Sequence, residues 1–62
     1  MDERESLRQR LQMAQAVLNI LEQQAVGFGK LHVPAHLLVE LEEKQREVAS
    51  LEARLAQLEG RP

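Results

Sequence analysis

Residues 25–37, AVGFGKLHVPAHL, contain every strong helix-breaking signal in the interior of this 62-residue chain. Gly27 and Gly29 can supply the left-handed backbone conformation that commonly ends an α-helix. Pro34 suits the first turn of a helix because its missing N–H would be unpaired there, and it disfavours helical geometry at Val33. The segment therefore predicts one helix before it and a second helix after it.

Apolar residues before this turn recur at alternating spacings of four and three, which is the period of the contact seam of a supercoiled helix. These seam residues are Leu7, Leu11, Ala14, Leu18, Leu21, Ala25 and Phe28. Asp2 with Glu5, or Ser6 with Gln9, can form a capping box at the beginning of the helix. We expect this helix to span about residues 3–28.

The same alternation continues after the turn over a similar length. Its seam residues are Leu37, Leu41, Lys44, Val48, Leu51, Leu55 and Leu58. We expect a second helix over about residues 34–59, with residues 60–62 as the beginning of a linker or tail. Two matched helices joined by a short loop, residues 29–33, predict an all-α, coiled-coil-like antiparallel two-helix hairpin, with residues 1–60 as a single domain.

Folding the chain at the middle of the loop pairs the two seams level by level. It places Leu7 opposite Leu55 and Ala25 opposite Leu37. The same register places Arg10 near Glu52 and Arg4 near Glu59. We expect both to form exposed ion pairs that favour the antiparallel orientation.

The first helix carries more apolar surface than its seam requires. Met13, Val17 and Ile20 each precede a seam residue by one position and form a second stripe. A two-helix unit has no third layer to cover this stripe, so we expect an interface rather than a broad edge of the core. The interface would join two hairpins in a four-helix bundle dimer, or dock a helix of a partner. The expected interface residues are Leu11, Met13, Val17, Leu18, Ile20, Leu21 and Leu38.

Three further groups of residues have expected roles near the turn and the seam. Phe28, Gly29 and Pro34 are the expected turn residues, and Phe28, Leu31 and Val33 are expected to close the loop end of the core. Asn19 and Lys44 are polar residues at or beside a seam, where such residues can fix register. Simple solvent exposure explains Asn19 and Lys44 equally well.

Composition excludes several classes of protein. The chain has no cysteine, which removes disulfides and thiolate metal sites and fits a reducing compartment. No apolar run exceeds three residues, so we expect neither a membrane span nor a signal peptide. We therefore expect a cytoplasmic protein. The net charge of −2 argues against a nucleic-acid partner, because nucleic-acid binders concentrate Lys and Arg on one face.

The sequence offers three arrangements that resemble chemical sites, and none predicts catalysis. His32, His36 and Glu40 have the spacing of a helical metal site, but His32 falls in the loop and two ligands make a poor site. Residues 27–30, GFGK, follow a helix and lack the Gly-Lys-Ser/Thr ending of a phosphate loop. The acidic run of the second helix has no evident cleft to shift its pKa values. We expect no metal, no cofactor and no enzymatic activity.

The turn and the second helix share a pattern with a known group of domains. The pattern comprises Leu18, Leu21, Glu22, Gln24-Ala25, Phe28-Gly29, Val33-Pro34, His36-Leu37-Leu38, Glu40-Leu41-Glu42 and residues 47–52. It resembles the short helical-hairpin effector-associated domains of bacterial conflict and signalling proteins, which adjoin caspase-like, TIR, NTPase or repeat domains. The resemblance implies a noncatalytic adaptor that joins an effector to a sensor, or to another copy, through packing of like hairpins.

The expected function is therefore a homotypic or adaptor module for protein–protein interaction. Its partners would be copies of itself or a related helical hairpin on another protein. The alternative is a purely structural coiled-coil oligomerisation domain, natural or designed, with no signalling role. A third hypothesis, a small regulator of an enzyme or of nucleic acid, is disfavoured by the acidic charge.

Overall fold

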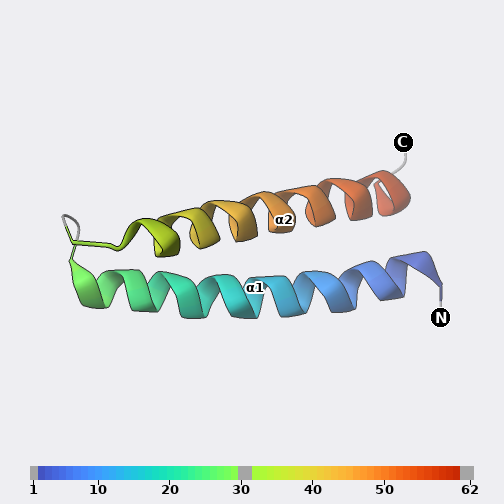
Figure 1. Ribbon diagram of the computed structural model, residues 1–62. Helices are drawn as coiled ribbons and strands as arrows, with labels where there is room; N and C mark the ends of the chain where they lie inside the picture. Colours follow the sequence, from blue (N-terminus) through green and yellow to red (C-terminus); the bar gives the residue numbers. More distant parts are fainter. Residues whose placement is uncertain (1, 30–31, 61–62) are drawn as a thin grey trace.

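The computed structural model describes residues 2–29 and 32–60, which form two α-helices packed side by side in opposite directions (Figure 1). Helix α1 spans Glu3–Phe28 and helix α2 spans Ala35–Glu59. The described residues contain no strand, and the molecule measures 44 × 21 × 14 Å. The predicted all-α two-helix hairpin is therefore confirmed. In the same residues, neither helix is apolar over a length sufficient to cross a membrane.

The beginning of α1 is capped by Asp2. The backbone N–H of Glu5 donates to Asp2 Oδ1 at 2.8 Å, and the N–H of Ser6 donates to the Asp2 carbonyl at 3.1 Å. Glu3 and Glu5 add negative charge to the first turn, where the helix dipole favours it. Of the two predicted caps, Asp2 is the one that begins the helix.

The end of α1 differs in detail from the prediction. Gly29 follows the last helical residue with φ 79° and ψ 160°, and its N–H donates to the carbonyl of Val26 at 3.1 Å. The expected left-handed helical geometry is therefore wrong, because ψ is extended rather than helical. This combination of angles is open essentially only to glycine. Gly27 lies within the helix and has no part in ending it.

Helix α2 begins at Ala35, one residue later than predicted. Pro34 has φ −60° and ψ 147°, so its backbone is extended rather than helical. Its carbonyl accepts from the N–H groups of Leu37 and Leu38, both at 3.1 Å, which makes Pro34 the residue that precedes the first turn. Among the residues that the structure describes, no side chain caps this helix.

The core is the narrow seam between the helices. In the described residues, the buried apolar side chains are Leu7, Ala14 and Leu37. The other predicted seam residues are half-buried, except Phe28, which is 49% exposed. Phe28 is the last residue of α1 and lies at the end of the seam, so it is less covered than the seam residues before it. A single seam of this width leaves the remaining faces of both helices uncovered.

The loop end of the core matches the expectation only in part. Val33 is half-buried, whereas Phe28 is exposed over about half of its surface and closes the core poorly. Leu31, the third residue expected here, lies outside the described residues, as do Arg61 and Pro62 of the expected tail.

Candidate helix-binding surface

Two ion pairs join the helices at the end of the hairpin that holds both termini. Arg54 donates to Glu3 Oε2 through Nη2 at 2.7 Å and through Nε at 3.1 Å. Arg8 pairs with Glu59. Both pairs fit a register in which Leu7 lies opposite Leu55.

The hairpin has two flanks, which differ in how their residues relate to the seam. Met13 and Val17 each precede a seam residue, and they line one groove with Glu47, which also precedes one. Arg8 and Glu59 each follow a seam residue, and they pair with one another across the helices. We name the first side the Met13 flank. The opposite side, which carries residues that follow a seam residue, is the Leu38 flank.

The division into flanks corrects the predicted ion pairs. Arg10 precedes a seam residue and lies on the Met13 flank, whereas Glu52 follows one and lies on the Leu38 flank. The described chain contains neither the Arg10–Glu52 pair nor the Arg4–Glu59 pair, and Glu59 binds Arg8 instead. Matching residues by level along the hairpin did not account for the side of the seam on which each one lies.

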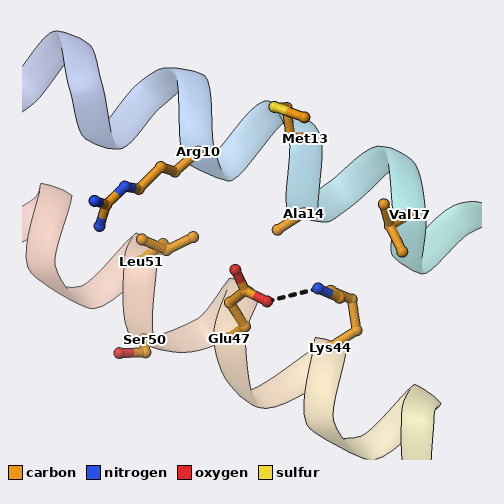
Figure 2. Close-up of a pocket in the computed structure, with 8 residues that line it drawn as sticks. All are labelled: Arg10, Met13, Ala14, Val17, Lys44, Glu47, Ser50 and Leu51. Carbon is orange, nitrogen blue, oxygen red and sulfur yellow. Dashed lines mark hydrogen bonds and ion pairs between the residues drawn. The ribbon is translucent and has the colours of Figure 1, made fainter.

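A groove of about 540 Å³ lies between the helices on the Met13 flank (Figure 2). Met13 and Val17 of α1 form one wall, while Glu47 and Ser50 of α2 form the other. The seam residue Ala14 lies between the two walls. Arg10 on α1 and Lys44 and Leu51 on α2 complete the lining, so the α1 wall is apolar apart from Arg10 and the α2 wall is mostly polar.

The groove continues along the flank toward the loop. A second hollow is lined by Val17 and Leu21 on α1, with Glu40 and Glu43 among its residues on α2. A third hollow follows at the loop end; its lining is Gln24, Gly27, Phe28, His36, Leu37 and Glu40. These hollows share residues at their borders, so they form one continuous surface along α1 from Arg10 to Phe28.

The wall formed by α2 is acidic. Glu40, Glu43 and Glu47 are exposed on the Met13 flank. Lys44 is a half-buried seam residue whose Nζ donates to Glu47 Oε1 at 2.7 Å (Figure 2). Among the described residues, Glu40 and Glu43 have no ion-pair partner. In the stretch lined by Glu40 and Glu43, the groove thus carries negative charge that no described cation pairs, whereas Arg10 lines the other stretch together with Glu47.

The structure divides the predicted interface residues into three groups. Leu11, Leu18 and Leu21 are half-buried in the seam of the hairpin itself. Met13, Val17 and Ile20 belong to the Met13 flank and are 72%, 40% and 55% exposed. Leu38 is exposed on the opposite flank, so it cannot share a surface with Met13. Asn19 also follows a seam residue and lies on the Leu38 flank.

Sequence reasoning missed one exposed apolar residue. Val26 is 80% exposed and lines a hollow at the loop end together with Ala25, Gly29 and Val33. It follows the seam residue Ala25, so its place on the Leu38 flank could have been read from the spacing.

The groove suits a helix better than a small molecule. Ligand pockets enclose most of the surface of their ligand, whereas this groove has only two walls. An α-helix packs into such a groove because its side chains fill the space between two neighbouring helices. The described residues contain no cluster of three His, Cys, Asp or Glu side chains that could hold a metal ion.

Comparison with protein-family models, with curated proteins and with solved structures gave no match to this chain.

Proposed function

We propose that this chain is a noncatalytic protein–protein interaction module that packs its Met13 flank against helices of other chains. The exposed stripe of Met13, Val17 and Ile20 is the observation that carries the proposal. Full burial of one large apolar side chain contributes about 1.5–3 kcal/mol, so covering this stripe is a substantial driving force for association.

The thin core supports the same proposal. Only three apolar side chains are buried in the described part of the chain. Domains of about 60 residues are marginally stable by their own cores, and chains without disulfides or metals commonly gain stability by association. A partner helix would supply the third layer that the hairpin lacks.

Two assemblies use the Met13 flank in this way. In one, two hairpins form a four-helix bundle dimer; in the other, a related hairpin on a different protein docks on the flank. The turn, with Phe28-Gly29 and Pro34, resembles that of bacterial effector-associated domains, which supports an adaptor that couples an effector domain to a sensor. Binding to a second, different protein distinguishes this adaptor from a coiled coil that only sets oligomeric state.

The test is the mass of the chain in solution, measured by sedimentation equilibrium over a concentration series. We expect weak self-association, seen as a mass above the 7.1 kDa monomer only at high concentration and a melting temperature that rises with concentration. The double variant Val17→Glu/Ile20→Glu should remain monomeric or lose helicity, because it places charges in the interface. An unchanged mass and melting temperature in this variant would show that the stripe is not an interface.

The matched control is Gln9→Glu/Gln23→Glu. It adds the same two charges to α1, but both positions are exposed on the side of the helix that faces away from α2. The control should associate as the unmodified chain does. An equal loss of association in both double variants would indicate a general effect of charge rather than a specific surface.

A further inference from the structure

We propose that the preferred occupant of the Met13 flank is an amphipathic helix of another protein, with an apolar stripe edged by Lys or Arg. This inference rests on the proposed function and specifies its partner. Each wall of the groove specifies one property of the partner. The two-fold symmetry of a dimer of this chain argues against a second copy as the occupant.

The wall formed by α1 requires an apolar stripe on the partner. Met13, Val17 and Ile20 recur at spacings of four and three, so they follow one line along α1. A helix laid along this line would present its own apolar residues at the same spacing. The stripe runs over two turns of α1, which gives a partner helix a continuous contact.

The wall formed by α2 requires positive charge on the partner. Glu40 and Glu43 are exposed, lie one turn apart and have no ion-pair partner in the described chain. Glu47 continues the acidic row but is already bound to Lys44. A helix in the groove with Lys or Arg beside its apolar stripe would place those cations against Glu40 and Glu43.

A second copy fits this groove poorly. Two copies can stack their Met13 flanks with aligned helices about a two-fold axis that runs either along or across the helices. An axis along the helices lays the apolar stripe of each copy over the acidic wall of the other. An axis across the helices pairs the two stripes but also brings the two acidic walls together. The first arrangement places apolar side chains against carboxylates, and the second places carboxylates against carboxylates, so both are unfavourable.

The described cations of this chain do not relieve that conflict. Arg8, Arg54 and Lys44 are bound within the hairpin, and Arg4 lies 4.0 Å from Asp2. Arg10 and Arg46 remain. Arg10 lies on the Met13 flank, three residues before Met13, and does not line the hollow that holds Glu40 and Glu43. Arg46 is on the side of α2 away from α1. In the described chain, the apolar stripe therefore has a cation, Arg10, at one end and no row of cations along its sides.

The experiment uses two labelled synthetic peptides of about 18 residues, which is about 27 Å of helix. Both carry Leu at alternating spacings of four and three. One peptide has Lys on both sides of the Leu stripe, and the other has Glu at the same positions. Binding to the full chain is measured by fluorescence anisotropy. We expect the Lys peptide to bind at least about ten-fold more tightly than the Glu peptide, and to weaken as salt is added.

Variants of the chain then locate the binding site. Glu40→Gln/Glu43→Gln should weaken binding of the Lys peptide about three- to thirty-fold, the range expected for two exposed ion pairs. The matched control Glu42→Gln/Glu52→Gln removes the same charge from the Leu38 flank and should change the affinity about two-fold or less. Val17→Gln/Ile20→Gln should abolish binding without adding charge, and circular dichroism checks that each variant stays helical.

Three results would overturn the inference, and they separate it from the proposed function. If both peptides bind equally and Val17→Gln/Ile20→Gln abolishes this binding, the chain is a helix-binding module but lacks the proposed preference for positive charge. Self-association that is tighter than binding of the Lys peptide, and that depends on Val17 and Ile20, would make a second copy the occupant. A chain that binds neither peptide and stays monomeric would refute both the inference and the proposed function.

Discussion

The seam and the Met13 flank are two apolar surfaces of the same helix, one position apart in the sequence, with opposite surroundings in the fold. Ala14 is buried against α2, whereas Met13, the residue before it, is 72% exposed. In a hairpin of two helices, each turn of one helix can bury about one residue against the other helix. An apolar residue one position away from the seam is therefore available to another chain.

The largest effect should come from comparing two adjacent leucines on α2. Leu37 is buried in the seam and Leu38 is exposed beside it. Leu37→Ala should destabilise the hairpin by about 2–5 kcal/mol, because it removes buried apolar volume and leaves a cavity. Leu38→Ala should change stability by about 0.5 kcal/mol or less.

Urea unfolding followed by circular dichroism, at a single protein concentration, measures both leucine variants. Because small domains have little stability in reserve, Leu37→Ala should already be partly unfolded in the absence of urea. Equal unfolding curves for the two variants would mean that the seam is not the stabilising surface of the hairpin.

The turn sets which residues of the two helices face one another, so it also maintains the division between seam and flank. Gly29 has φ 79°, where a residue with a side chain is strained, and Gly29→Ala should cost about 1–3 kcal/mol. Gly27→Ala is the matched control, because a Cβ there meets no atom within 4 Å and the residue is helical. It should stabilise the hairpin by about 0.5–1 kcal/mol.

Thermal unfolding of the two alanine variants gives the comparison directly. The melting temperature should fall for Gly29→Ala and rise for Gly27→Ala. If both substitutions raise it, the backbone at Gly29 does not need the positive φ that ends α1.

The sequence predicts the seam well because the seam depends on residue spacing within each helix. Alternating spacings of four and three put residues on one side of a helix whatever that helix packs against. The helix-breaking residues between Gly27 and Pro34 show where the turn lies. These two signals together are sufficient for an all-α hairpin, and every predicted seam residue except Phe28 is at least half-buried.

The features that were predicted wrongly depend on geometry between the helices. Arg10 and Glu52 lie at the same level of the hairpin but on opposite sides of its seam, and spacing within one helix does not reveal this. The identity of Gly29 shows only that a special backbone conformation is allowed there, and does not determine which one is adopted.

Lys44 connects the two surfaces, because its stem lies in the seam and its ammonium group binds Glu47 on the Met13 flank. Lys44→Leu should stabilise the hairpin by about 1 kcal/mol, since it extends the apolar seam opposite Leu18. The loss of one exposed ion pair offsets only part of this gain. For a domain of this size the expected rise in melting temperature is about 4–8 °C.

The control for this substitution is Lys44→Gln, which removes the charge without adding an apolar side chain. It should not raise the melting temperature. Both variants release Glu47 from Lys44, so both should bind the Lys peptide more tightly than the unmodified chain does. Equal melting temperatures for Lys44→Leu and Lys44→Gln would show that this position does not contribute to the seam.

The smallest expected effect concerns the ion pair between Glu3 and Arg54, on the Met13 side of the open end of the hairpin. Both side chains are 53% exposed, so Glu3→Gln should cost only about 0.2–1 kcal/mol. Glu5→Gln is the control, because Glu5 lies in the same first turn and has no ion-pair partner in the described chain. The difference between the two variants in urea unfolding isolates the contact with α2 from the effect of the helix dipole.

Salt provides the decisive measurement for this pair. At about 1 M salt the Debye length is about 3 Å, so the difference between Glu3→Gln and Glu5→Gln should nearly disappear. The contribution of the seam should persist under the same conditions, because apolar burial is not screened. A difference that survives high salt would mean that Glu3 stabilises the hairpin by packing. Its side of the hairpin would then contribute to the fold at that end, rather than remain free for a partner along its whole length.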